Sequence, residues 1–132
     1  MAQILVKKII DLEHSVVKLR DDGIVQVNFG DNTDIDLKES MEVVAAIGEI
    51  TQGKKALVLN IAGVNTTATS EARDHSASEA GAEFTIADAF VTTSLAQKIL
   101  GNFYMNFHKP KAPSRIFDNE QKAIDWLKSG KF

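Results

Sequence analysis

The chain has 132 residues, a length typical of one domain, and 44% of its residues are hydrophobic and 25% charged. Its formal net charge is −3, with acids and bases mixed along the sequence, which argues against nucleic acid or an anionic membrane as the main partner. There is no cysteine, so disulfides, thiol catalysis and thiolate metal sites are excluded. We expect residues 1–132 to form a single domain.

The N-terminal segment, residues 1–10, differs from a signal peptide, because Lys7 and Lys8 interrupt its apolar residues and no small-residue cleavage site follows. No apolar run reaches the length of a membrane-spanning helix. We therefore expect a cytoplasmic protein without membrane insertion. The periodicity of residues 2–10 does not decide between a strand and a short helix.

A β-hairpin with one buried face is predicted for residues 17–29. Apolar and polar residues alternate on both sides of Asp22-Gly23, a turn pair that tolerates a positive φ. Asp36 and Glu39 then have the spacing of a helix capping box, and apolar residues recur with helical periodicity over residues 37–52. This pattern indicates an amphipathic helix packed on a sheet.

The second half of the chain alternates between strands and helices. Residues 56–61 (ALVLNI) are apolar on both faces apart from Asn60, which is typical of a central strand. A loop rich in Thr and Ser, residues 64–70, precedes a weaker helix expected at residues 71–82. We then expect a strand at residues 84–91 and a helix at residues 95–107, opened by a capping box of Ser94 and Gln97. A short strand at residues 114–117 and a last helix at residues 119–129, capped by Asp118, follow the break at the prolines. The order implies an α/β sandwich with a mixed sheet.

Several short segments resemble a known family. They are Asp22-Gly23, the helix start Ser70-Glu71-Ala72-Arg73, and a C-terminal pattern made of Ile99–Phe103, Lys109-Pro110, Pro113, Arg115–Phe117, Ala123 and Trp126-Leu127. In these residues and in its order of elements, the chain resembles the STAS domain, the SpoIIAA-like fold of anti-sigma-factor antagonists. It is more similar to a bacterial family of small STAS/CRAL-TRIO-like proteins. The resemblance covers nearly the whole chain and implies an α/β STAS/SpoIIAA-like sandwich, a homodimer and no established activity.

The same resemblance suggests a phosphorylation site. In STAS antagonists the loop after the central strand contains an Asp-Ser pair, and a partner kinase phosphorylates the Ser. The matching positions here are Ala68 and Thr69, followed by Ser70, so a regulatory protein partner is implied although Ala68 replaces the acid. A phosphate there would lie at a helix N-terminus, where free N–H groups favour an anion. The alternative is that Thr69 is only the N-cap of that helix, a common role for Thr.

Arg73 lies one turn into this helix, among small neighbours that leave space around its side chain. Two interpretations remain for it, an anion-binding residue grouped with Thr69 and Ser70, or a structural ion pair with Glu83 or Asp88.

No residue pattern indicates catalysis, a metal or a cofactor. Asp74, His75 and Ser76 include the residue types of a hydrolase triad, but adjacent helical residues point about 100° apart and cannot form the required chain of hydrogen bonds. His108 is isolated and expected at the surface. The protein is therefore not expected to be an enzyme. An enzyme would need a cluster of perturbed acids around Arg73 or His75.

The helix expected at residues 95–107 is apolar on more than one face, so it lies between other elements or contacts a partner. We expect Tyr104, Met105 or Phe107 in a homodimer interface. The alternative is a pocket beneath the helix for an apolar ligand, as the CRAL-TRIO kinship implies. The candidate residues for either surface are Leu100, Phe103, Tyr104, Met105 and Phe107.

These features favour a non-enzymatic regulatory or protein-interaction module, with the helix at residues 95–107 and the loop at residues 64–70 as contact surfaces. The second hypothesis is a carrier or sensor of a small apolar or lipid-like molecule. An enclosed apolar cavity would favour the second hypothesis, and an exposed flat aromatic patch would favour the first.

Overall fold

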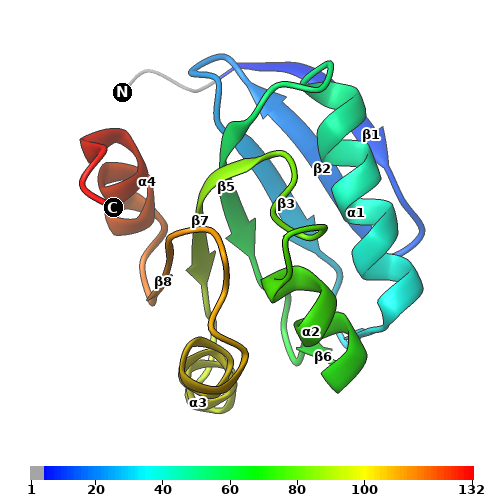
Figure 1. Ribbon diagram of the computed structural model, residues 1–132, viewed down its shortest axis with the longest axis vertical. Coiled ribbons are helices and arrows are strands. Elements are labelled where there is room, and N and C mark those ends of the chain that lie inside the picture. Colours follow the sequence, from blue (N-terminus) through cyan, green and yellow to red (C-terminus); the bar gives the residue numbers. More distant parts are fainter. Residues whose placement is uncertain (1–4) are drawn as a thin grey trace.

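A computed structural model describes residues 5–132, which contain a six-stranded mixed sheet with helices on both faces (Figure 1). The strand order is β1-β2-β3-β5-β7-β8. The first three strands pair antiparallel, and β3, β5, β7 and β8 pair parallel. Their bounds are Val6–Asp11 (β1), Ser15–Arg20 (β2), Val25–Phe29 (β3), Ala56–Ile61 (β5), Thr85–Val91 (β7) and Ser114–Phe117 (β8).

Three helices cover one face of the sheet and one helix covers the other. The helices α1, α2 and α3 each connect two neighbouring parallel strands. Such connections are right-handed and here all run in one direction along the sheet, so the three helices lie on the same face. The last helix packs on the opposite face against β5, β7 and β8 (Figure 1). The bounds are Leu37–Ile50 (α1), Ser70–Ala77 (α2), Leu95–Phe103 (α3) and Glu120–Ser129 (α4).

The N-terminal half follows its local signals closely. The undecided segment at residues 2–10 overlaps the edge strand β1, which ends at Asp11, and its residues 2–4 lie outside the described part. Gly23 turns the predicted hairpin with φ +84°. The capping box is confirmed, because Glu39 N donates to Asp36 Oδ1 at 2.8 Å and Asp36 N donates to Glu39 Oε1 at 3.5 Å. The helix α1 ends at Ile50.

Each face of the sheet has its own hydrophobic cluster. Successive residues of a strand point to opposite faces, so Val58 joins the cluster beneath α1, and Leu59 joins the cluster beneath α4. The first cluster contains Val17, Val25, Val27, Val43, Ala46, Ile47, Ile50, Ala56 and Val58. The second contains Ile24, Leu59, Ala87, Ala89, Val91, Ala123, Ile124 and Leu127.

The helix α1 ends two residues before the predicted residue 52, and two other helix boundaries also differ from the prediction. The helix α2 ends at Ala77 rather than at residue 82, because Ser78 is extended with ψ 169° and its hydroxyl donates to the carbonyl of His75. The last helix is capped by Asn119 and not by Asp118, since Lys122 N donates to Asn119 Oδ1 at 3.0 Å. In both places neighbouring polar residues compete for the same capping role.

Three short elements were not predicted. The strands β4 (Asp34–Ile35) and β6 (Thr67–Ala68) pair parallel to each other beside the main sheet and tie the loop before α2 to the loop before α1. The helix expected at residues 95–107 is α-helical only to Phe103 and continues as a π-helical turn, η1 (Tyr104–His108), which ends at Lys109 with φ +49°. Within residues 5–132 no helix is both long enough and apolar enough to span a membrane.

Candidate functional site

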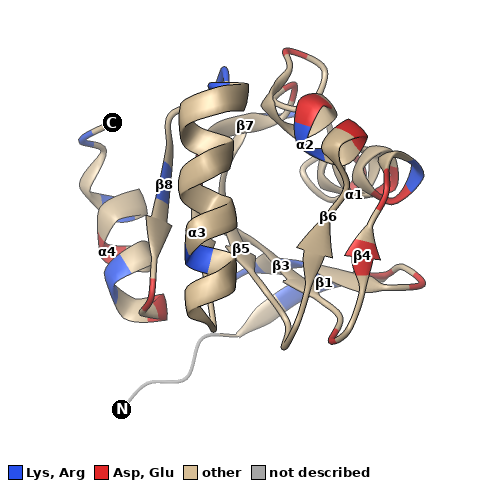
Figure 2. Ribbon diagram, turned by 90° about the horizontal axis from the view of Figure 1, so that it is seen from below, with Lys and Arg blue, Asp and Glu red and all other residues tan. Residues whose placement is uncertain are grey.

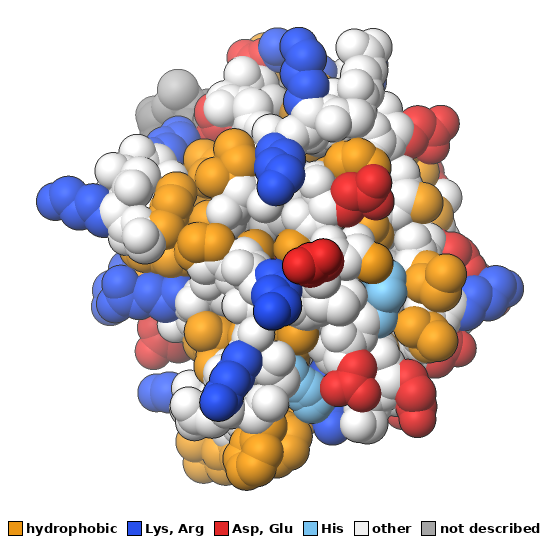
Figure 3. Space-filling model, viewed as in Figure 1, with side chains coloured by type: hydrophobic (Ala, Val, Ile, Leu, Met, Phe, Trp, Pro, Cys, Tyr) orange, Lys and Arg blue, Asp and Glu red, His pale blue; other side chains and the backbone are white. Residues whose placement is uncertain are grey.

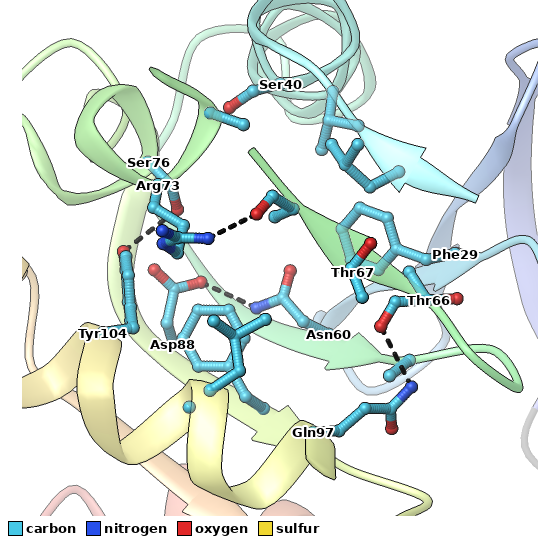
Figure 4. Close-up of a pocket in the computed structure, with 18 of the residues that line it drawn as sticks. Phe29, Ser40, Asn60, Thr66, Thr67, Arg73, Ser76, Asp88, Gln97 and Tyr104 are labelled. Atoms are coloured by element: carbon cyan, nitrogen blue, oxygen red, sulfur yellow. Dashed lines mark hydrogen bonds between the residues drawn. The ribbon is translucent and has the colours of Figure 1, made fainter. Parts of the chain in front are cut away.

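A partly enclosed cavity of about 200 Å³ lies between the sheet and the helices α1, α2 and α3 (Figure 4). It extends to the carboxyl ends of β3, β5 and β7, the edge where ligands bind in many α/β proteins. Most of its surface is apolar, and the polar side chains that line it contribute only a small share of that surface. The apolar lining includes Phe29, Ile35, Val43, Val44, Ile47, Phe90, Leu100 and Ile116.

The neighbouring strands β5 and β7 bring Asn60 and Asp88 together on the cavity side of the sheet. Asn60 Nδ2 donates to Asp88 Oδ1 at 2.9 Å, and it also lies 3.3 Å from the carbonyl of Ala89. Asp88 lines the cavity (Figure 4). Burial raises the pKa of Asp88 to about 6, and the hydrogen bond from Asn60 opposes that rise. The carboxyl of Asp88 therefore titrates much closer to neutral pH than an exposed aspartate does.

Arg73 extends from α2 into the same cavity. Its Nη1 donates to the carbonyl of Ala68, and its guanidinium carbon lies 5.6 Å from the centroid of the Phe103 ring. Of the two interpretations of Arg73, the structural ion pair with Glu83 or Asp88 is wrong, because Arg73 has no carboxylate oxygen within 4.0 Å among residues 5–132. The small side chains around this part of α2 give the arginine room to reach a carbonyl and a ring instead. Its Nε is buried and has no hydrogen-bond partner in that range.

Thr69 is the N-cap of α2, as one of the two interpretations predicted. Its Oγ1 accepts from Ala72 N at 3.2 Å, and its own N–H donates to the carbonyl of Ile35 at 2.9 Å. Ser70 follows as the first residue of the helix and is exposed. Phosphorylation of Thr69 or Ser70 remains a prediction.

Gln97 holds the loop after β5 in place. Its side chain is buried, and its Nε2 donates to the carbonyl of Gly63 at 2.8 Å and lies 3.2 Å from the carbonyl of Thr66. The predicted capping box is therefore only half formed: Gln97 N donates to Ser94 Oγ at 3.2 Å, while Gln97 Oε1 accepts from the N–H of Thr93. The side chain of Gln97 thus positions one wall of the cavity.

The inner face of the segment α3–η1 belongs to the cavity. Leu100 and Tyr104 line it, and Tyr104 Oη donates to Ser76 Oγ at 3.1 Å. Burial raises the pKa of Tyr104 above its usual value, and the negative charge of Asp88 adds to this effect. Tyr104 is therefore a neutral hydrogen-bonding group at the polar end of the cavity.

The outer face of the same segment is exposed and apolar. Leu95, Ile99 and Phe107 are 73%, 61% and 72% exposed, and Phe103 and Phe107 stack with their ring centroids 4.3 Å apart. Met105 is half-buried. Figure 2 shows that α3 has few charged residues compared with α1 and α2, and Figure 3 shows hydrophobic side chains gathered over α3 at the lower edge of the molecule. We call Leu95, Ile99, Phe103 and Phe107 the outer α3 face.

The two histidines of this region have structural contacts. His75 Nδ1 and Ser40 Oγ lie 2.8 Å apart and link α2 to α1, and within residues 5–132 no carboxylate lies within 4.0 Å of His75 to orient it as a catalytic base. His108 is not a surface residue, because its side chain is only 8% exposed, with its Nε2 3.6 Å from Asp74 Oδ1. No group of three His, Asp or Glu in the described part could hold a metal ion.

Of the residues selected from the sequence, Arg73, Leu100 and Tyr104 line the cavity, whereas Thr69, Ser70, Phe103, Met105 and Phe107 lie outside its lining. Sequence reasoning did not identify the polar pair in the sheet as part of a site. The available signal was a polar residue inside each of two buried strands, Asn60 in ALVLNI and Asp88 in TIADAFV. Polar side chains inside buried strands are rarely left without a hydrogen-bond partner, so two of them on neighbouring strands could have been expected to pair.

A solved structure gives the class of this fold. An uncharacterized protein from Shewanella loihica PV-4, a member of the DUF3478 family with a SpoIIAA-like fold, aligns with 96% of this chain and 98% of its own at a TM-score of 0.57 and 12% sequence identity. The chain therefore has a SpoIIAA-like fold, which confirms the fold implied by the sequence resemblance. Residues 17–131 match the model of a family described as "Domain of unknown function (DUF7793)", and the chain belongs to this family. No curated protein matches the sequence.

Proposed function

We propose that this protein is a cytoplasmic, non-enzymatic regulatory module that holds a small, largely apolar molecule in the cavity beneath α1, α2 and α3. The cavity itself is the observation that supports this proposal. Binding sites for small molecules are concave, mostly apolar and equipped with a few convergent polar groups, and the cavity has all three properties. We therefore place ligand binding, the second hypothesis from the sequence, ahead of protein interaction, the first.

The cavity also has a suitable size. An apolar cavity of about 150 Å³ is enough to bind benzene, and the cavity here measures about 200 Å³. A six-membered ring or a branched aliphatic group therefore fits between the sheet and α1. Long lipid chains do not fit within that volume.

The test is native mass spectrometry of the protein purified from its own cells. We expect an adduct that disappears on denaturation. Val44→Trp places an indole in the cavity and should abolish the adduct, whereas Ala45→Trp, on the exposed side of α1, should keep it. An adduct that survives Val44→Trp, or a wild-type protein without any adduct, would contradict the proposal.

A second candidate function, contact with another copy of the chain, is favoured by the outer α3 face. Exposed aromatic and aliphatic side chains that gather in one patch are typical of protein interfaces. We propose a homodimer in which Phe103 and Phe107 lie at the interface. A regulatory partner could then act on the protein separately, by phosphorylating Thr69 or Ser70 at the N-terminus of α2.

Light scattering at micromolar concentration tests the dimer. Ile99→Glu should convert a dimer into a monomer, because it buries a charge in an apolar interface. Lys98→Glu is the matched control, since Lys98 is the exposed neighbour of Ile99 on the same helix. A wild-type protein that is monomeric under these conditions would refute the homodimer.

A further inference from the structure

Two oppositely charged side chains face the cavity without binding each other. Arg73 extends from α2 and Asp88 from β7, and Figure 4 shows both pointing into the same end of the cavity. Within residues 5–132 neither side chain has an ion-pair partner within 4.0 Å. Both side chains are partly buried, and a charge that loses contact with water without an ion-pair partner is costly, so their presence in a cavity points to partners that come from outside the chain.

Two donors on one edge of the Arg73 guanidinium, Nε and Nη2, have no hydrogen-bond partner within residues 5–132. Its Nη1 is engaged by the carbonyl of Ala68, and Phe103 covers one of its faces. Its Nε–H is buried without a partner, and Nη2 forms no hydrogen bond within residues 5–132. The Nε and Nη2 donors of an arginine form a planar fork that matches the two oxygens of a carboxylate.

Only one of the two oxygens of the Asp88 carboxyl accepts a hydrogen bond from the described residues. Oδ1 accepts from Asn60 Nδ2, whereas Oδ2 has no donor among the described residues. Asn60 fixes the orientation of the group, because it is itself only 7% exposed and also lies against the carbonyl of Ala89. A carboxylate held in this way is a ready acceptor for an ammonium group.

We propose that the cavity binds a small zwitterion with an apolar side group, the chemistry of an apolar amino acid. The ligand carboxylate binds the free edge of Arg73, the ligand ammonium binds Asp88, and the side group packs on the apolar wall formed by Val43, Val44 and Ile47 of α1. This assignment rests on the proposed function, because it names the ligand class of the same cavity.

Ligands with a single charge fit less well. A simple carboxylate would pair with Arg73 but would leave the acid of Asp88 without a partner and close to a second negative charge. A simple amine would pair with Asp88 and leave Arg73 unpaired. Only a molecule with both charges compensates both side chains, and the cavity has apolar space left for its side group.

The experiment is a series of four probes measured by titration calorimetry at one pH and one salt concentration. L-Phenylalanine has both charges, 3-phenylpropanoate lacks the ammonium, 2-phenylethylamine lacks the carboxylate, and 2-phenylethanol lacks both. We expect L-phenylalanine to bind roughly tenfold or more tightly than either singly charged probe, since a hydrogen bond to a charged group contributes about one factor of ten or more. This comparison needs only the wild-type protein.

Two variants then assign the charges. Arg73→Met should remove the preference of the protein for L-phenylalanine over 2-phenylethylamine and keep its preference over 3-phenylpropanoate. Asp88→Asn should remove the preference for L-phenylalanine over 3-phenylpropanoate and keep the preference over 2-phenylethylamine. Arg115→Met is the control, because Arg115 is exposed on β8 and does not line the cavity, so it should change neither preference.

The outcomes separate this inference from the proposed function. Equal affinity for L-phenylalanine and either singly charged probe would overturn the zwitterion. Equal affinity for all four probes would also overturn it and leave a cavity that binds apolar molecules. If no probe binds, the inference is wrong, and the adduct experiment with Val44→Trp decides the proposed function independently.

Discussion

The guanidinium of Arg73 lies 5.6 Å from the ring centroid of Phe103, so a residue of the cavity contacts a residue of the outer α3 face. Phe103 in turn stacks on Phe107, which is largely exposed. Any movement of Arg73 toward a ligand changes the surroundings of Phe103. The contact thereby links the cavity to the surface that we propose for dimerisation.

The Arg73–Phe103 contact predicts a measurable coupling. In a double-mutant cycle of Arg73→Met and Phe103→Leu, the interaction free energy should be about 0.5–1 kcal/mol, the range of partly exposed cation–π pairs. Urea unfolding of the four proteins gives the value. The cycle of Arg73→Met with Phe107→Leu should be additive, because Phe107 stacks on Phe103 rather than on the arginine. Additivity in both cycles would show that the contact has no energetic role.

The stability of the protein should depend on the protonation of Asp88. Burial raises the pKa of its carboxyl from 3.8 to about 6, so the folded state holds this proton at pH values where the unfolded chain has lost it. This contribution to stability is complete below about pH 4 and is lost as the pH rises to about 6. At pH 7 the charged group then costs on the order of 2–3 kcal/mol.

Asp88→Asn tests this pH dependence, because asparagine keeps the shape of the side chain and removes the charge. The variant should be more stable than the wild type at pH 7 and about equally stable at pH 4. The measurement is the free energy of unfolding of both proteins at the two pH values. A difference that is the same at both values would mean that the Asp88 carboxyl titrates normally in the folded protein.

Thr69 should stabilise α2 as its N-cap. Thr69→Ala removes the acceptor for Ala72 N and should cost about 1 kcal/mol, whereas Thr69→Ser keeps a hydroxyl in place and should cost much less. Ser70→Ala, at the exposed first position of the helix, serves as the control. Equal losses for the Ala and Ser variants of Thr69, measured by chemical denaturation, would argue against the cap.

Gly48 provides a close contact between α1 and Phe84. A Cβ at this position would overlap the Phe84 ring, so Gly48→Ala should destabilise the protein by about 1–3 kcal/mol although alanine favours helices. Phe84→Leu should restore part of the loss in the double variant. Thermal unfolding of the single and double variants measures the effect. Glu49→Ala, on the exposed side of the helix, should change little, and a similar loss there would exclude the steric explanation.

Elements with local signals were predictable from the sequence. The hairpin at Gly23 and the capping box of Asp36 and Glu39 each depend on residues within a few positions of one another, and both formed as expected. The order of strands and helices was predictable for the same reason. The helix ends at Ser78 and Asn119 were missed because several neighbouring polar residues can cap, and only packing selects one.

The polar end of the cavity depends on contacts between distant parts of the chain. Asn60 and Asp88 meet because β5 and β7 pair in one register, and neither residue has a local motif. Arg73 was identified from its small neighbours. Its hydrogen bond to the carbonyl of Ala68 is local, but its contact with Phe103 depends on where α3 lies. Residue types alone therefore offered a pocket under α3 as an alternative to a homodimer interface, and they could not show that Arg73 and Asp88 face the same cavity without forming an ion pair.

The sheet separates the cavity from most of the hydrophobic cluster beneath α4. The cavity and the outer α3 face lie on one side, and the cluster around Leu59 and Leu127 lies on the other beneath α4. A single layer of backbone stands between them. Val43 and Ile47 line the cavity and also belong to the cluster beneath α1, so a redesign for a different ligand is best confined to lining residues outside that cluster, such as Val44 and Leu100. One face of the sheet can therefore stay constant while selected cavity residues of α1, α2 and α3 are varied, an arrangement suited to engineered sensors.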